Sequence, residues 1–92
     1  MGTEFTRTRG VRLVATGLIY QGSAKRCWGI LSNTGSGSIV LRDGGAAGVV
    51  LWDGGIAAGQ WIPFIAPIVA TLTTGIHATL TGVTDATFQV DY

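Results

Sequence analysis

LRDGGAAGVVLWDGGIAAGQ, residues 41–60, contains two near-copies of one ten-residue phrase. In each copy a short apolar run meets Asp-Gly-Gly, which begins at Asp43 in the first copy and at Asp53 in the second. Asp and Gly tolerate positive φ angles, so an Asp-Gly pair between apolar runs predicts a turn between two strands. Similar turn-forming residues recur on both sides of this segment. The segment therefore predicts the middle of a small all-β domain.

The rest of the chain divides into seven to eight short strands at a spacing of about 8–12 residues, which is typical of a β-sandwich or barrel. Residues 75–82, GIHATLTG, alternate apolar and polar side chains, and so do residues 86–92, ATFQVDY. Residues 33–37, NTGSG, predict a loop, and residues 83–85, VTD, predict a turn. No segment has a sustained 3.6-residue apolar period, so we expect little or no helix. The predicted fold is a small antiparallel, jelly-roll-like β-sandwich over residues 13–92.

Residues 60–65 predict a strand broken by Pro63, which belongs at a sheet edge or a bulge. Residues 25–32, KRCWGILS, predict a strand with apolar residues on both faces, which suits a central strand or one that faces a neighbouring chain. Alternation there places Cys27, Gly29 and Leu31 on one face, and Trp28 and Ile30 on the other.

The composition predicts burial of surface between subunits. Charged residues make up 12% of the 92 residues and hydrophobic residues 47%, whereas a soluble domain averages about 25% charged residues. The most apolar run, residues 61–72, holds two prolines and is shorter than the roughly 20 residues of a helical membrane span, so no membrane contact is predicted. Obligate interfaces resemble a core cut in half. The candidates for an oligomer interface are Trp28, Trp52, Trp61 and Phe64.

The N-terminal end is basic. Residues 1–26 hold five of the six Arg and Lys residues and only one of the five acidic residues. Residues 1–12 are predicted to form a flexible arm that docks on an acidic protein surface through Arg7, Arg9 and Arg12. Three arginines with little aromatic interleaving are a thin footprint for nucleic acid, which is not an expected partner. Within the arm, residues 2–5 match what adjacent cloning sites commonly encode and are left out of the fold.

No catalytic, cofactor or metal site is predicted. Asp43 and Asp53 supply too few oxygen ligands for a calcium loop, and they read as turn formers. His77 shares the outward face of its strand with Thr79 and Thr81, and this pattern predicts a polar surface or interface residue. Cys27, the single cysteine, excludes an intrachain disulfide; beside Trp28 in an apolar strand, it is expected to be a buried, inert thiol.

The order of these motifs resembles small virion proteins of tailed phages, namely capsid decoration (cement) proteins and related head-fibre modules. The resemblance covers roughly residues 13–92 and is carried by turns and alternating strands. The matching stretches are Leu41-Arg42-Asp43-Gly44, Val50-Leu51, the segment from Pro63 to Pro67, residues 74–82 and residues 86–92.

The resemblance implies a jelly-roll-like protein without enzymatic activity. It would be made in the host cytoplasm, form a homotrimer and bind the major capsid protein on the outer surface of the shell. The basic segment at residues 6–12 corresponds to the terminal arm that reaches across neighbouring subunits in such families.

Two alternatives stay open. Three tryptophans on a sandwich would also suit a carbohydrate- or receptor-binding module of a tail fibre or baseplate. A small hydrolase would need His77 to work with one of the four aspartates, Asp43, Asp53, Asp85 and Asp91. The chain lacks the G-x-S-x-G nucleophile motif, which counts against the hydrolase.

Overall fold

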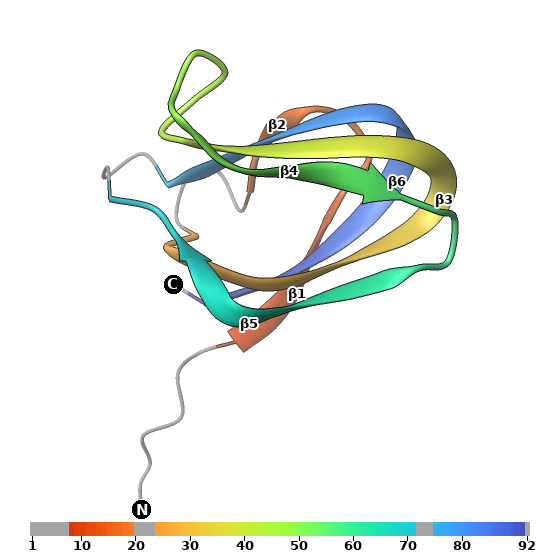
Figure 1. Ribbon diagram of the computed structural model, residues 1–92, viewed down its shortest axis with the longest axis horizontal. Helices are drawn as coiled ribbons and strands as arrows, with labels where there is room; N and C mark the ends of the chain where they lie inside the picture. Colours follow the sequence, from red (N-terminus) through yellow and green to blue (C-terminus); the bar gives the residue numbers. More distant parts are fainter. Residues whose placement is uncertain (1–7, 20–23, 72–74, 92) are drawn as a thin grey trace, which may run out of the picture.

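The computed structural model describes residues 8–19, 24–71 and 75–91. These residues form six β-strands in one antiparallel sheet, and none of them lies in an α-helix. The predicted all-β fold is confirmed. The strands are β1 (Thr8–Leu13), β2 (Gly17–Leu18), β3 (Arg26–Asp43), β4 (Val50–Ile56), β5 (Trp61–Val69) and β6 (Ile76–Asp91) (Figure 1).

The two longest strands, β3 and β6, pair with each other along their whole length. The pairing runs from Arg26 opposite Asp91 to Asp43 opposite Ile76, with register shifts near the middle. Both strands curve together around one end of the molecule (Figure 1). As a result the first half of β3 and the second half of β6 lie in one layer, and the remaining halves lie in the other.

The four shorter strands complete the two layers. β1 and β5 flank the pair in one layer, which we call the β5 layer, and β2 and β4 flank it in the other, the β4 layer. β3 and β6 each contribute one half to each layer, so the chain can be numbered as eight strand segments from the N-terminus. Across the β5 layer the order of these segments is 1-8-3-6, and across the β4 layer it is 2-7-4-5. This is the strand order of a jelly roll. The jelly-roll-like sandwich is thus confirmed, with six strands in place of seven to eight because two of them continue from layer to layer.

The predicted loop at residues 33–37 and turn at residues 83–85 are wrong as strand breaks. Both segments lie inside strands, at the place where β3 and β6 bend. Gly35 and Gly82 have φ angles of 95° and 79°, a conformation that other residues rarely adopt. The turn-forming residues therefore mark a bend that two paired strands share.

A bulge at Trp28 overturns the predicted faces of residues 25–32. The register of β3 shifts between Cys27 and Gly29 against both neighbouring strands. An extra residue at a bulge changes the phase of the inward positions. Cys27 and Ile30 consequently both point into the core and are fully buried, whereas Leu31 is only half-buried.

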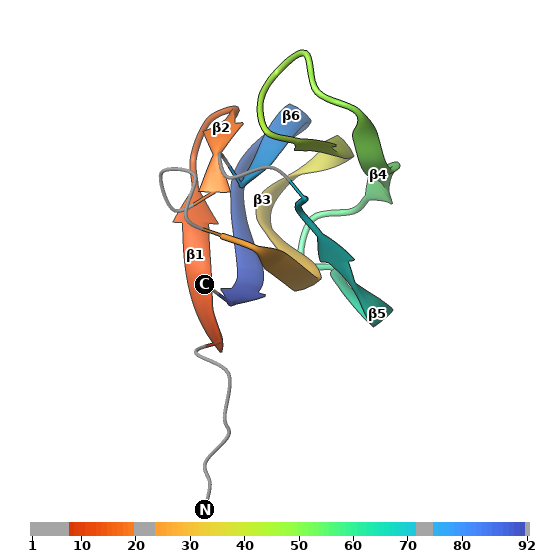
Figure 2. The same ribbon diagram turned by 90° about the vertical axis from the view of Figure 1, so that its left-hand side faces the viewer.

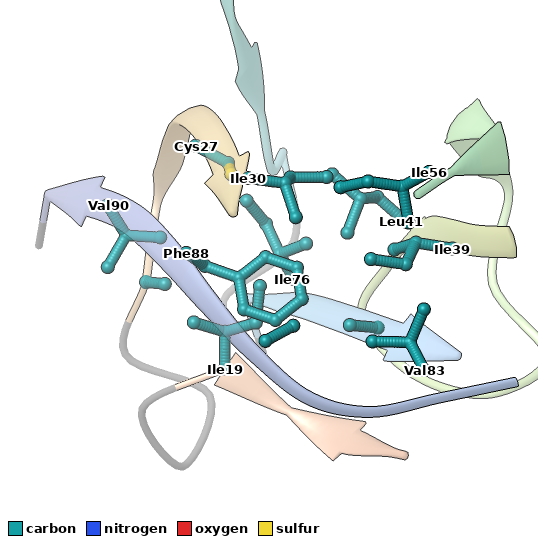
Figure 3. Close-up of a cluster of buried hydrophobic side chains, with 13 residues drawn as sticks. Ile19, Cys27, Ile30, Ile39, Leu41, Ile56, Ile76, Val83, Phe88 and Val90 are labelled. Atoms are coloured by element: carbon teal, nitrogen blue, oxygen red, sulfur yellow. The ribbon is translucent and has the colours of Figure 1, made fainter. Parts of the chain in front are cut away.

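The core fills the space between the layers (Figure 3). In β6 the inward positions are as predicted for Ala86, Phe88 and Val90, and the predicted inward residue Tyr92 lies outside the described residues. Phe88 is the largest fully buried side chain. The buried apolar residues are Ile19, Ala24, Cys27, Ile30, Ile39, Leu41, Ile56, Ile76, Ala78, Val83, Ala86, Phe88 and Val90.

The N-terminal boundary of the domain also differs from the prediction. Residues 8–12, expected in the arm, belong to β1, which pairs with residues 86–91 of β6. Val11 and Leu13 alternate with outward residues and pack against the core. The arginines of this segment predict an arm, but its alternating apolar residues place it in the sheet. Residues 1–7 lie outside the described residues.

The two Asp-Gly-Gly segments have different structures. The first follows β3 as a turn, with Gly44 at φ 90°, as predicted. The second lies inside β4, where Asp53 pairs with Val40 of β3, so the predicted second turn is displaced to residues 57–60. The same tripeptide thus ends one strand and continues another: Asp43 is the last residue of β3, whereas Asp53, Gly54 and Gly55 all pair with β3 inside β4.

Gly37→Ala should destabilise the bend. A Cβ at Gly37 would stand 1.8 Å from the carbonyl oxygen of Thr81, so the paired strands would have to move apart, at a cost of about 1–3 kcal/mol. Urea unfolding checks this, with Gly17→Ala as the control because nothing lies within 4 Å of a Cβ at Gly17. Equal stability of the two variants would contradict the tight bend.

Candidate assembly surface

β5 is an edge strand with two apolar faces. It pairs with β3 on one side, and no other described strand is paired with it. Ile62, Phe64 and Ile68 pack against the core. Since side chains alternate along a strand, the residues between them face away from the core. β4 and β5 run along the same side of the sandwich, opposite β1 and β2 (Figure 2).

The outward face of β5 is uncovered within the described structure. Trp61 is 45% exposed, Ile65 106% and Val69 47%. No charged residue occurs between residues 61 and 69. A single exposed apolar residue needs no explanation, whereas a contiguous row of them marks an interaction site. We call this row the β5 stripe; its members are Trp61, Pro63, Ile65, Pro67 and Val69, of which Pro67 is half-buried and the others are exposed.

An arch in β5 raises the centre of the stripe. Pro63 pairs with Gly29 and Ile68 pairs with Cys27, so the four residues 64–67 lie opposite Trp28 alone. The additional residues cannot all stay in the ladder: Phe64 packs against the core, whereas Ile65 and Ala66 are exposed. Ile65, within the arch, is therefore the most exposed of the large apolar side chains in the described part of the chain.

The two prolines limit how a partner can bind. Proline carries no backbone N–H, so β5 lacks two of the donors that an added strand would need. Prolines in edge strands are a common protection against edge-to-edge pairing. A partner of β5 is consequently expected to pack on the side chains of the stripe and not to extend the sheet.

Trp61 is supported from below by a glycine. A Cβ at Gly29 would stand 2.3 Å from Cη2 of Trp61, so the indole lies directly over β3 because position 29 has no side chain. The ring is thus positioned before any partner arrives. Preorganised tryptophans are frequent anchors of protein interfaces.

The other predicted interface aromatics are less exposed. Trp52 of β4 and Phe64 of β5 meet edge to face, with ring centroids 5.3 Å apart and an interplanar angle of 65°. Both are half-buried and pack against the core. The structure thus gives Trp52 and Phe64 a packing role between the layers and leaves Trp61 on the surface.

Trp28 belongs to a polar cluster beside the stripe. Its indole Nε1 donates a hydrogen bond to Oδ2 of Asp91 at 3.1 Å, and Arg26 forms an ion pair with the same carboxylate at 2.9 Å. The Arg26 guanidinium also lies 5.8 Å from the centre of the Trp28 ring. Asp91 faces outward as predicted, yet it is only 3% exposed because these partners cover it. Such a polar rim next to an apolar surface is typical of interfaces.

A second polar network involves one of the predicted arm residues. Arg12 donates to Asp85 from Nε and from Nη2, the latter at 2.7 Å, and Asn33 donates to Asp85 at 3.1 Å. Arg12, followed by Asn33, lowers the pKa of Asp85, and Asp85 in turn raises the pKa of Arg12. Arg12 is thus held within its own chain. Of the other two predicted contacts, Arg9 lies in β1 opposite Val90, and Arg7 lies outside the described residues.

The polar groups that could support chemistry are dispersed. Asp43 accepts hydrogen bonds from the backbone and hydroxyl of Thr71, and Asp53 is exposed on β4. Within the described ranges no three His, Cys, Asp or Glu residues are placed to hold a metal ion. His77 pairs with Arg42 and Leu18 in the sheet. Among the residues that the structure describes, no candidate nucleophile, base and acid therefore lie together.

His77 is not the surface residue that alternation predicts. It is 7% exposed, and its Nδ1 has no hydrogen-bond partner. Burial, and next the positive charge of Arg42, lower the pKa of His77. The neutral imidazole is accordingly the form that the folded state favours.

The principal feature that sequence reasoning missed is Ile65. It lies midway between Pro63 and Pro67 in a strand in which all nine residues are apolar. This pattern was the available signal. Prolines indicate an edge strand, and apolar residues on both faces of an edge strand indicate that the outer face binds a partner.

Comparisons with protein-family models, with curated proteins and with solved structures found no match to this chain. None of the described segments is a helix of the length and apolarity needed to cross a membrane.

Acidification between pH 7.5 and 5.5 should destabilise the protein through His77. Its pKa in the folded state lies below the roughly 6.5 of an unfolded chain, so the unfolded state binds more protons in this range and stability falls as the pH falls. His77 is the only histidine. The midpoint of urea unfolding should therefore depend less on pH in His77→Gln than in the wild type. The same dependence in both proteins would contradict this role.

Cys27 should be unreactive in the native protein. Burial raises the pKa of its thiol to about 12, and only the thiolate reacts readily. A thiol reagent at pH 8 should label it at a small fraction of the rate seen in urea. Rapid native labelling, followed by mass spectrometry, would show that the core around β3 opens readily.

Proposed function

We propose that this chain is a virion structural protein without enzymatic activity that binds the outer surface of a capsid and stabilises the shell as a homo-oligomer. The observation that carries the proposal is the β5 stripe, a row of exposed apolar side chains on a compact jelly roll. A surface of this kind works by being covered with another protein surface.

Association through the stripe favours stability as well as assembly. Covering apolar surface contributes about 25 cal/mol per Å², and a domain of this size buries only about 60–65% of the surface of its unfolded chain. Binding that requires the folded state adds to its stability. The low charge of the chain, 12%, is consistent with a surface that is partly covered in the assembled state.

The capsid is proposed as the location on the basis of the resemblance to decoration proteins, which implies a trimer on the outer shell. Jelly-roll strand order agrees with that resemblance. The cations of the N-terminal end, Arg7 and Arg9, remain the proposed contacts to an acidic shell protein, whereas Arg12 is occupied by Asp85.

A glycan- or receptor-binding module is the alternative, and Trp61 is the feature that favours it. Its exposed ring could stack on a sugar. A platform needs several exposed rings, however, and Trp52 packs against Phe64 while Trp28 is hydrogen-bonded to Asp91. The assembly role therefore has the broader support.

Mixing the protein with undecorated capsids and sedimenting the shells tests the proposal. The wild type should co-sediment. Arg7→Glu/Arg9→Glu should lose most of this binding, and added salt should weaken wild-type binding because exposed charges are screened. Ala46→Glu/Ala47→Glu, which adds charge on an exposed turn of the opposite layer, is the control and should bind normally.

Deleting residues 1–12 would not be an equivalent test, since it would remove most of β1. Shell binding that is unchanged in the double arginine variant would remove these residues from the mechanism. Absence of wild-type co-sedimentation, together with binding in a glycan screen, would favour the receptor-binding alternative.

A further inference from the structure

We propose, resting on the oligomeric part of the proposed function, that the β5 stripe packs against the β5 stripe of a second copy of this chain, antiparallel and around a twofold axis at Ile65. The partner is thus the same protein, and the contact is face to face.

The sequence of β5 is symmetric about Ile65 at two of its four pairs of positions, and the pair next to Ile65, Phe64 and Ala66, differs. It reads WIPFIAPIV from Trp61 to Val69. Positions at equal distance from Ile65 hold the same residue in two cases, Ile62 with Ile68 and Pro63 with Pro67. The outermost pair joins two large, exposed apolar side chains, Trp61 and Val69.

A twofold axis turns this pattern into self-complementarity. In an isologous contact, if residue i of one copy meets residue j of the other, then j also meets i. With the axis at Ile65, Pro63 of each copy lies against Pro67 of the other, and Trp61 lies against Val69. Each tryptophan then meets a smaller partner, and the raised Ile65 side chains meet at the centre.

The chemistry of the stripe fits its own copy better than a charged surface. Because residues 61–69 carry no charge, packing two stripes together removes no charged group from water, a step that is costly when the group stays unpaired. The polar cluster of Arg26, Trp28 and Asp91 lies beside the stripe and can remain at the rim. The missing N–H groups of Pro63 and Pro67 disfavour strand addition, which leaves face-to-face packing.

A standard interface takes about 800 Å² from each partner, about a sixth of the 4866 Å² that this chain exposes. The stripe spans nine residues and adjoins half-buried Leu31 of β3, which pairs with Trp61. A second copy therefore covers the stripe together with its neighbours on the same layer.

A twofold contact has a consequence for the number of subunits. It pairs copies, so an assembly in which every stripe is covered contains an even number of chains. This departs from the trimer that the resemblance implies. The solution mass separates the two.

Cross-linking through Ile65→Cys tests the contact directly. A residue on a twofold axis meets its own copy, so mild oxidation at micromolar concentration should give a disulfide-linked dimer. Cys27 should not interfere because it is buried. Val14→Cys, at a position 64% exposed outside the stripe, is the matched control and should cross-link at least tenfold more slowly. Equal rates for the two variants would overturn the proposal.

Light scattering on Ile65→Glu completes the test. This substitution places two carboxylates against each other on the axis and should weaken association by at least about thirtyfold, the effect of losing an interface hot spot; Val14→Glu should not. The wild type should have the mass of a dimer or a larger even assembly. A wild-type monomer or trimer, or an unchanged mass in Ile65→Glu, would overturn the proposal.

Co-sedimentation with capsids tests the proposed function independently of the contact at Ile65. Shell binding by a wild type that fails the Ile65 tests would leave the proposed function standing without this contact. Ile65-dependent dimers that ignore shells would support the contact and reject the capsid assignment.

Discussion

β3 and β6 pair with each other along their whole length, and every other described strand pairs with one of these two. These strands come from distant parts of the chain, with Arg26 opposite Asp91 and Asp43 opposite Ile76. Each has one edge in this pairing, which leaves one free edge for the shorter strands: β1 and β2 pair with β6, and β4 and β5 pair with β3. Because the pair bends at its glycines, one continuous sheet closes over its own core.

The same bend decides where apolar surface is left over. β4 and β5 pair with opposite halves of β3, in different layers, and lie on the same side of the sandwich (Figure 2). Trp52 and Phe64 fill the space between them. β5 still has a second apolar face that no described residue covers, and its prolines and arch shape that face for contact through side chains.

Local signals predicted much of this fold. Alternation in β6 gave Ala86, Phe88 and Val90 as core residues, and the first Asp-Gly-Gly segment gave a turn. The turn-forming residues at 33–37 and 83–85 predict strand breaks, and this prediction is wrong. Such residues do not reveal whether pairing with a neighbouring strand continues through a bend. Nor does alternation reveal the bulge at Trp28, which depends on the register with β5 and β6.

The surface was less predictable for the same reason. Both faces of β5 are apolar, so only the pairing of Ile62 with Ile30 shows which face is inside. With Ile62 on the inner face, Phe64 packs against the core, and Trp61 and Ile65 lie on the exposed face. The burial of His77 likewise depends on neighbours that no local pattern contains.

Side-chain footprinting with hydroxyl radicals shows whether another copy covers the β5 stripe. At concentrations where the protein is assembled, Trp61 and Ile65 should be protected, and dilution should restore their labelling while Val14 labels equally in both states. Equal labelling of Trp61 and Ile65 at all concentrations would contradict the account.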